Sequence, residues 1–92
     1  MIESFKHKGL KRLYEDGDPS GLRADMVEKI ENILTLLDMA KAPDVLNAPS
    51  FRLHQLKGEL KGFWSVTVRA NWRIIFRFRN GNAQDVELID YH

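Results

Sequence analysis

The spacing of apolar side chains changes once along this chain, and that change constrains the fold more than any other feature. From Phe63 to Arg69, and again from Trp72 to Arg79, apolar and polar residues alternate, as in strands with one buried face. Asn80-Gly81 follows, a pair typical of hairpin turns because both central residues of a type I′ turn need a positive φ. The sequence therefore predicts an antiparallel hairpin whose last strand covers about Ala83 to Tyr91.

The first half of the chain carries helical spacing instead. In its longest apolar pattern, Val27, Ile30, Leu34 and Leu37 recur at intervals of three and four. The elements expected before Phe51 are a short strand, two helices and an irregular connection: Ile2 to Phe5, Lys6 to Glu15, Ala24 to Ala40 and Lys41 to Ser50. Helices followed by strands predict an α+β fold, with a short N-terminal strand and two helices packed on one face of a small, mainly antiparallel sheet. We expect one domain over residues 1–92 and an open second face of the sheet.

Composition narrows the classes of function. The 92 residues include no cysteine, which excludes disulfides, thiolate metal sites and cysteine nucleophiles. Residues 1–50 carry 7 Lys+Arg against 9 Asp+Glu and residues 51–92 carry 7 against 4, so the positive charge lies in the second half and favours a polyanion there. No apolar run is long enough to cross a membrane and the start does not resemble a signal peptide, so we expect a cytoplasmic protein.

The polar residues of the second half supply the groups that metal-free RNA cleavage requires. Histidine can take the proton of a ribose 2′-hydroxyl or protonate the departing oxygen, and His54 and His92 are available. The planar fork of Arg73 suits the phosphorane, Tyr91 can stack on a base, and Asp90 can orient an imidazole or act as the base. We expect no metal or cofactor, because the histidines lack metal-ligand spacing.

Plainer interpretations stay open for the same residues. His54 fits a hydrogen-bonded histidine at a sheet edge, the basic face fits ordinary solvated side chains, and the last three residues fit a frayed tail. Strict alternation also places Asp90 and His92 on one face and Tyr91 on the other. From a flat strand, these three residues could not all face one substrate. If they share a site, we expect the chain to turn inward after Ile89 or to contain a bulge there.

Four segments together resemble one known family. RLHQLKG at 52–58, FWSVTVRANWRIIFRF at 63–78 and LIDYH at 88–92, with IESFKHKGL at the start, resemble the HigB toxins of the RelE-like superfamily. The resemblance implies a bacterial mRNA interferase that acts in the ribosomal A site and is neutralised by a HigA antitoxin with a helix-turn-helix fold. It assigns active-site roles to four residues and phosphate contact to Arg73, with Lys57 in support. The four active-site positions are His54, Asp90, Tyr91 and His92.

The mechanism hypothesis is attack of the 2′-hydroxyl on the adjacent phosphate, with the acid and base histidines not distinguished. Arg69 and Arg77 are further candidate phosphate contacts on the basic strand face. Two alternatives remain: a ParE-like toxin that inhibits DNA gyrase by binding, and a plain RNA-binding domain. For the antitoxin, both a sheet edge and a groove between helices are possible surfaces.

Overall fold

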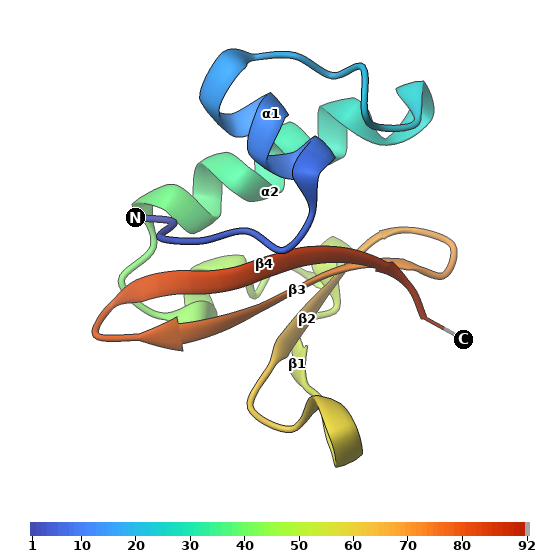
Figure 1. Cartoon of the computed structure of the whole chain (residues 1–92). Helices are drawn as coiled ribbons and strands as arrows, with labels where there is room; N and C mark the ends of the chain where they lie inside the picture. The colour runs from blue at the N-terminus through green and yellow to red at the C-terminus, as the bar shows by residue number, and fades with distance from the viewer. Residues whose placement is uncertain (92) are drawn as a thin grey trace.

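The computed structural model describes residues 1–91 and places two helices on one face of a sheet (Figure 1). The helices are α1 (Lys8–Asp16) and α2 (Val27–Met39), and the strands are β1 (His54–Gln55), β2 (Trp64–Arg69), β3 (Trp72–Arg79) and β4 (Asn82–Asp90). Short 3₁₀ turns are η1 (Ala24–Met26), η2 (Pro43–Leu46), η3 (Pro49–Phe51) and η4 (Gly58–Leu60). The expected α+β class is confirmed.

The four strands lie in the order β1-β2-β3-β4, and every neighbouring pair is antiparallel. The expected N-terminal strand appears as two isolated parallel bridges, Ile2 to Ala83 and Phe5 to Val86, along the outer edge of β4. Asn80 and Gly81 have φ of 55° and 77°, which confirms the predicted turn between β3 and β4.

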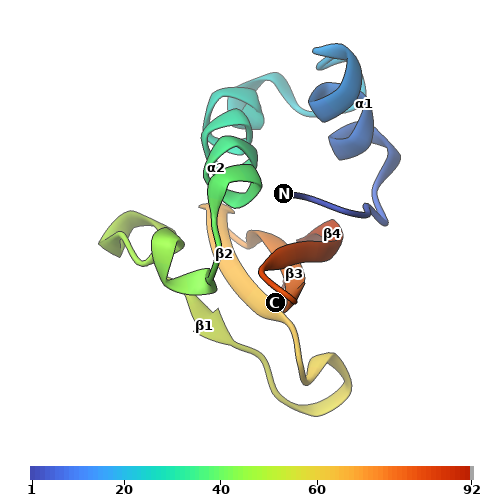
Figure 2. The same ribbon diagram turned by 90° about the vertical axis from the view of Figure 1, so that its left-hand side faces the viewer.

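The core lies between the helices and the sheet face that they cover (Figure 2). Fully buried apolar side chains fill the layer between: Leu10, Ile30, Ile33, Leu37, Val66, Ile74, Phe76 and Val86.

Both ends of α1 are capped next to this core. The helix begins where the Nδ1 atom of His7 accepts a hydrogen bond from the Leu10 N–H at 3.2 Å. It ends at Gly17, whose φ of 67° is the left-handed conformation expected of a helix C-cap.

The opposite face of the sheet, here called the distal face, is partly covered, so the expectation of an open face is wrong in part. The connection between β1 and β2 folds back beneath the sheet (Figures 1 and 2). Leu56 and Phe63 from this connection bury Ile75 of β3 in a second apolar cluster, with Leu60 and Ile89 at its edge. The cluster therefore covers the part of the distal face around Ile75.

On the helix side of the sheet, the carboxylate of Asp38 joins α2 to α1 and to the N-terminal segment. The Asp38 Oδ1 atom in α2 accepts hydrogen bonds from the Tyr14 hydroxyl in α1 at 2.6 Å and from the Ile2 N–H at 3.1 Å. The bond to Tyr14 holds the pKa of Asp38 below its ordinary value. The same bond raises the pKa of Tyr14 to about 12.

We expect Asp38→Asn to lower the free energy of unfolding at pH 7 by about 1 kcal/mol, because two charge-assisted hydrogen bonds in a largely solvated position are weakened. Because the pKa of Asp38 is lowered by folding, its carboxylate stabilises the folded state. This stabilisation is fully present above the pKa that Asp38 has in the unfolded chain, and it is lost as the pH falls through the lower pKa of the folded state. Urea denaturation at pH 7 and pH 2.5 measures both. A difference from wild type that stays constant down to pH 2.5 would contradict this account.

Candidate functional site

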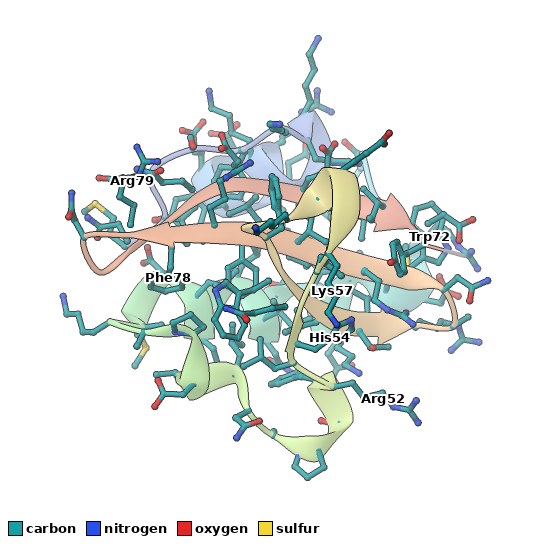
Figure 3. The ribbon with its side chains drawn as sticks, turned by 90° about the horizontal axis from the view of Figure 1, so that it is seen from below. Arg52, His54, Lys57, Trp72, Phe78 and Arg79 are labelled. Atoms are coloured by element: carbon teal, nitrogen blue, oxygen red, sulfur yellow. The ribbon has the colours of Figure 1, made fainter. Side chains whose placement is uncertain are left out.

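Register places several of the predicted site residues on the distal face. His54 in β1 lies opposite Ser65 in β2, which lies opposite Ile75 in β3, and Thr67 lies opposite Arg73. Residues directly opposite each other in an antiparallel pair project from the same face. Seen from below, His54 and Lys57 lie near the middle of this face (Figure 3).

His54 is exposed, and its ring is fixed by the backbone. The Nδ1 atom lies 3.0 Å from the carbonyl oxygen of Arg52. A carbonyl oxygen only accepts, so Nδ1 carries the hydrogen and, in the neutral ring, Nε2 carries the lone pair. Nε2 is therefore the nitrogen that can take up a proton from a ligand.

Arg73 is held in a similar way at the β2–β3 turn. Its Nη1 donates to the carbonyl oxygen of Ala70 at 2.6 Å and to that of Trp72 at 3.2 Å. Ala70 has a φ of 52°, and Arg52, which holds His54, has a φ of 49°. Left-handed backbone at residues other than glycine costs about 1–2 kcal/mol each, and such residues cluster at functional sites. Both candidate side chains are thus fixed by the carbonyl of a strained residue.

We expect Ala70→Gly to raise the free energy of unfolding by up to about 1 kcal/mol, because glycine adopts a positive φ without the steric cost. The gain is limited by the greater freedom of glycine in the unfolded chain. Thermal and urea unfolding measure the change. A clear loss of stability would show that the left-handed conformation of Ala70 carries no strain.

The separation of the two side chains suits one phosphodiester. His54 and Arg73 lie two strands apart, about 10 Å, and two residues apart along the strands, about 7 Å, so their Cα atoms are about 12 Å from each other. Both side chains lie on the distal face and are long enough to reach a group between them. The arrangement can bring a proton acceptor and a guanidinium to opposite sides of a phosphate.

The end of β4 places its two described site residues on opposite faces. Asp90 lies opposite Trp72, on the side of the helices, and the ladder is regular there, so the expected bulge or inward turn after Ile89 is absent up to residue 91. The Tyr91 N–H donates to the Asn71 carbonyl oxygen at 2.8 Å, which continues the ladder by one residue. Alternation from Ile89 then places Tyr91, 41% exposed, on the distal face. His92 lies outside the described residues.

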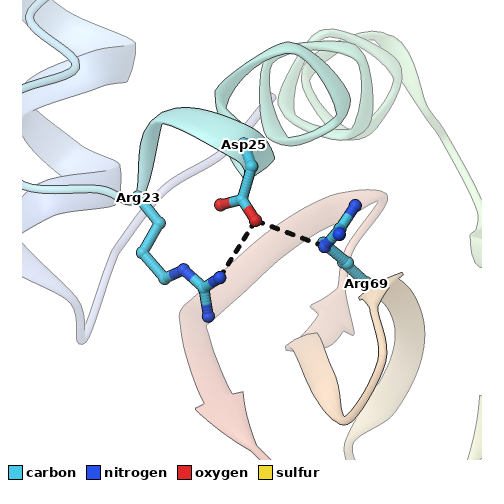
Figure 4. A network of polar contacts seen from close by, with 3 residues as sticks. All are labelled: Arg23, Asp25 and Arg69. Carbon is cyan, nitrogen blue, oxygen red and sulfur yellow. Dashed lines mark hydrogen bonds and ion pairs between the residues drawn. The ribbon is translucent and has the colours of Figure 1, made fainter.

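Arg69 does not share the face of Arg73, and the expectation from alternation is wrong here. A register shift between Thr67 and Arg69 places Arg69 opposite Trp72, on the helix side. There the Arg69 Nε lies 3.2 Å from Asp25 Oδ2 in η1, which also binds Arg23 at 2.9 Å (Figure 4). The carboxylate therefore ties the end of β2 to the helical layer.

We expect Asp25→Asn to lower the free energy of unfolding by less than about 1 kcal/mol, because all three side chains are more than one-third exposed. The difference from wild type should shrink in 1 M salt, which screens exposed charges. Urea denaturation at low and high salt measures it. A loss that persists in 1 M salt would mean that Asp25 acts through packing instead.

The other predicted phosphate contacts lie farther along the distal face. The Arg77 guanidinium stacks 4.3 Å from the centre of the Phe63 ring, and its Nε lies 3.6 Å from Asp85 Oδ2. Lys57 and Lys61 line a hollow of about 550 Å³ beneath the β1–β2 connection. Arg77 is thus already paired in the free protein, whereas the two lysines border open space.

The sequence did not reveal the polar atoms between His54 and Arg73. The Oγ of Ser65 and the Oγ1 of Thr67 are buried and have no hydrogen-bond partner within residues 1–91. Alternation predicted that both lie on the polar face of β2, but no sequence pattern indicates that their hydroxyls lack partners. Arg52 and Ala70 were missed because their role depends on a backbone conformation and a carbonyl.

Neither a metal site nor a membrane-spanning helix is found within residues 1–91. Across residues 1–91, histidine, aspartate and glutamate form no group of three or more that could hold a metal ion. In the same part of the chain, no helix has the length and apolar character needed to cross a membrane.

Solved structures similar to this chain define its class of fold. The YoeB–YefM complex from Staphylococcus aureus matches with a TM-score of 0.62 and 17% identity, covering 100% of this chain and 98% of the other. A YafQ mutant from E. coli matches with a TM-score of 0.58 and 21% identity, covering 95% and 87%. This chain therefore shares the fold of YoeB and YafQ.

Sequence comparison gives the family. Residues 3–92 match the family described as RelE-like toxin of type II toxin-antitoxin system HigB. The chain is 51% identical over 92 residues to Endoribonuclease HigB of Proteus vulgaris, covering 100% of both. It is 34% identical over 94 residues to Toxin HigB-1 of Vibrio cholerae serotype O1, covering 96% and 95%. The chain belongs to the HigB-like family of RelE-like toxins, which confirms the resemblance drawn from its motifs.

Proposed function

We propose that this chain, as an endoribonuclease toxin of the HigB family, cleaves messenger RNA in the ribosomal A site without a metal ion. The observation that carries the proposal is the placement of His54 and Arg73 on one face, each fixed by a backbone carbonyl. One supplies a proton acceptor and the other a guanidinium, and the two can reach the same phosphodiester.

In the proposed reaction the 2′-hydroxyl oxygen attacks the adjacent phosphorus and its proton passes to a base. The Nε2 atom of His54 suits that role because Nδ1 holds the hydrogen. Arg73 stabilises the additional negative charge on the phosphorane through its planar fork. The bond from phosphorus to the 5′-oxygen breaks, that oxygen takes a proton from the acid, and a 2′,3′-cyclic phosphate remains.

The end of the chain completes the proposed site. Tyr91, on the distal face beyond Arg73, positions the neighbouring nucleotide by stacking. His92 is proposed as the acid because His54 takes the role of the base, and Asp90 is proposed as the group that orients His92. Lys57 and Arg77, which lie on the distal face, are proposed to bind flanking phosphates.

The proposed partner is a HigA-type antitoxin with a helix-turn-helix fold, since toxins of this class act with an antitoxin. The outer edge of β4 is occupied by the N-terminal segment, and β1, the other edge strand, is two residues long. A groove of about 350 Å³ between α1 and α2, lined in part by Leu13, Leu34 and the exposed Met39, is the better candidate surface.

We expect His54→Gln and Arg73→Lys each to lower the cleavage of mRNA on translating ribosomes by about a hundredfold or more, with folding retained. Lysine keeps the charge of Arg73 but loses the two-pronged geometry. Mapping of mRNA 5′ ends measures cleavage, and circular dichroism checks the fold. Arg79→Lys, an exposed arginine on the same strand, is the matched control.

Two results would contradict the proposal. Unchanged cleavage by both folded variants would remove His54 and Arg73 from the chemistry. Growth inhibition without any cut mRNA, accompanied by inhibition of DNA gyrase, would favour a toxin that acts by binding.

A further inference from the structure

Two buried hydroxyl groups on β2 have no role in the free fold. Ser65 is 1% exposed, and among the residues that the structure describes, its Oγ and the Oγ1 of Thr67 have no hydrogen-bond partner. A buried hydroxyl without a partner is costly, and folded proteins contain few of them. The nearest buried side chains on the same face, such as Ile75 and Phe63, are apolar, so alanine or valine would suit the packing equally well.

Each hydroxyl lies beside one of the proposed active-site residues. Ser65 is directly opposite His54, and Thr67 is directly opposite Arg73. The Cβ atoms of such pairs are about 4.5–5.5 Å apart, so one side-chain rotation brings the polar atoms into hydrogen-bond distance. In the free protein the two larger side chains instead bind carbonyl oxygens, those of Arg52 and of the β2–β3 turn.

We propose that Ser65 and Thr67 are positioning residues for RNA cleavage, whose hydroxyls hold His54 and Arg73 when a bound phosphodiester draws these two side chains together. This inference rests on the proposed function. In the resting arrangement, backbone carbonyls hold the His54 and Arg73 side chains apart. In the working arrangement, the hydroxyls hold these side chains over the middle of the distal face.

The chemistry of the groups fits the second arrangement. The Thr67 hydroxyl accepts one N–H of the Arg73 guanidinium, which has five donors and keeps a pair for the phosphate. The Ser65 hydroxyl accepts the Nδ1–H of His54 in place of the Arg52 carbonyl, which preserves the tautomer and leaves Nε2 for the 2′-hydroxyl. Each hydroxyl gains a partner when substrate binds, so the cost of burying it is offset in the complex that reacts.

The test compares stability with catalysis in variants that lack one hydroxyl. Ser65→Ala and Thr67→Val remove it, Thr67→Ser keeps it, and Thr35→Val removes an exposed hydroxyl that binds the Glu31 carbonyl in α2. We expect Ser65→Ala and Thr67→Val to unfold at or above the wild-type Tm and to lose about tenfold or more in kcat on ribosome-bound mRNA. KM should change by no more than about threefold. Thr67→Ser and Thr35→Val should retain kcat within about threefold.

Each alternative outcome is distinct. A wild-type chain that cuts no mRNA overturns the proposed function and this inference with it. A wild-type chain that cuts, with Ser65→Ala and Thr67→Val as active as wild type, overturns this inference alone. Loss of Tm together with kcat in these variants, or loss of kcat in Thr67→Ser equal to that in Thr67→Val, assigns the hydroxyls a structural role and also overturns it.

Discussion

The pairing of β3 with both of its neighbours is the interaction on which the rest of this structure depends. β3 is hydrogen-bonded along its length to β2 on one side and to β4 on the other, and a tight turn connects it to each of these strands. Because side chains alternate between faces, a shift of one residue in either ladder would exchange the buried Ile74 and Phe76 with Arg73 and Arg77. The register that buries the core is therefore also the register that carries Arg73 to the face of His54.

The two faces of the sheet differ in how fully their polar groups are satisfied. Next to the helix layer, Asp38 joins α1, α2 and the N-terminal segment through two hydrogen bonds to one oxygen, and Asp25 pairs with two arginines. The distal face instead contains Ser65 and Thr67, whose hydroxyls lack hydrogen-bond partners in the described part of the chain. Two of the residues with left-handed backbone hold side chains of this face by their carbonyls, Arg52 for His54 and Ala70 for Arg73. The polar groups next to the helices are thus paired and stabilise the fold, whereas the polar groups without partners lie on the distal face.

Local patterns predicted the elements well because local physics decides them. Alternation located β2 and β3, the Asn80-Gly81 pair located their turn into β4, and the spacing of Ile30 and Leu34 located α2. The motifs also identified the family. The structure places His54 and Arg73, two of the site residues that they predict, on one face of the sheet. What the sequence could not supply is non-local: the bulge that turns Arg69 toward Asp25, and the connection that folds back to bury Ile75. A bulge is one inserted residue in a ladder, and nothing in the run Thr67 to Arg69 distinguishes it from a regular strand.

The regular end of β4 sharpens how the terminal residues can act. Since Asp90 lies opposite Trp72 on the helix side and Tyr91 follows it in the ladder, the two side chains project from opposite faces at the rim of the sheet. A carboxylate on one side of the rim cannot contact the phosphate that His54 and Arg73 reach from the other side. The proposed cleavage accordingly gives Asp90 an orienting role toward the terminal imidazole, and it gives His54 the proton from the 2′-hydroxyl.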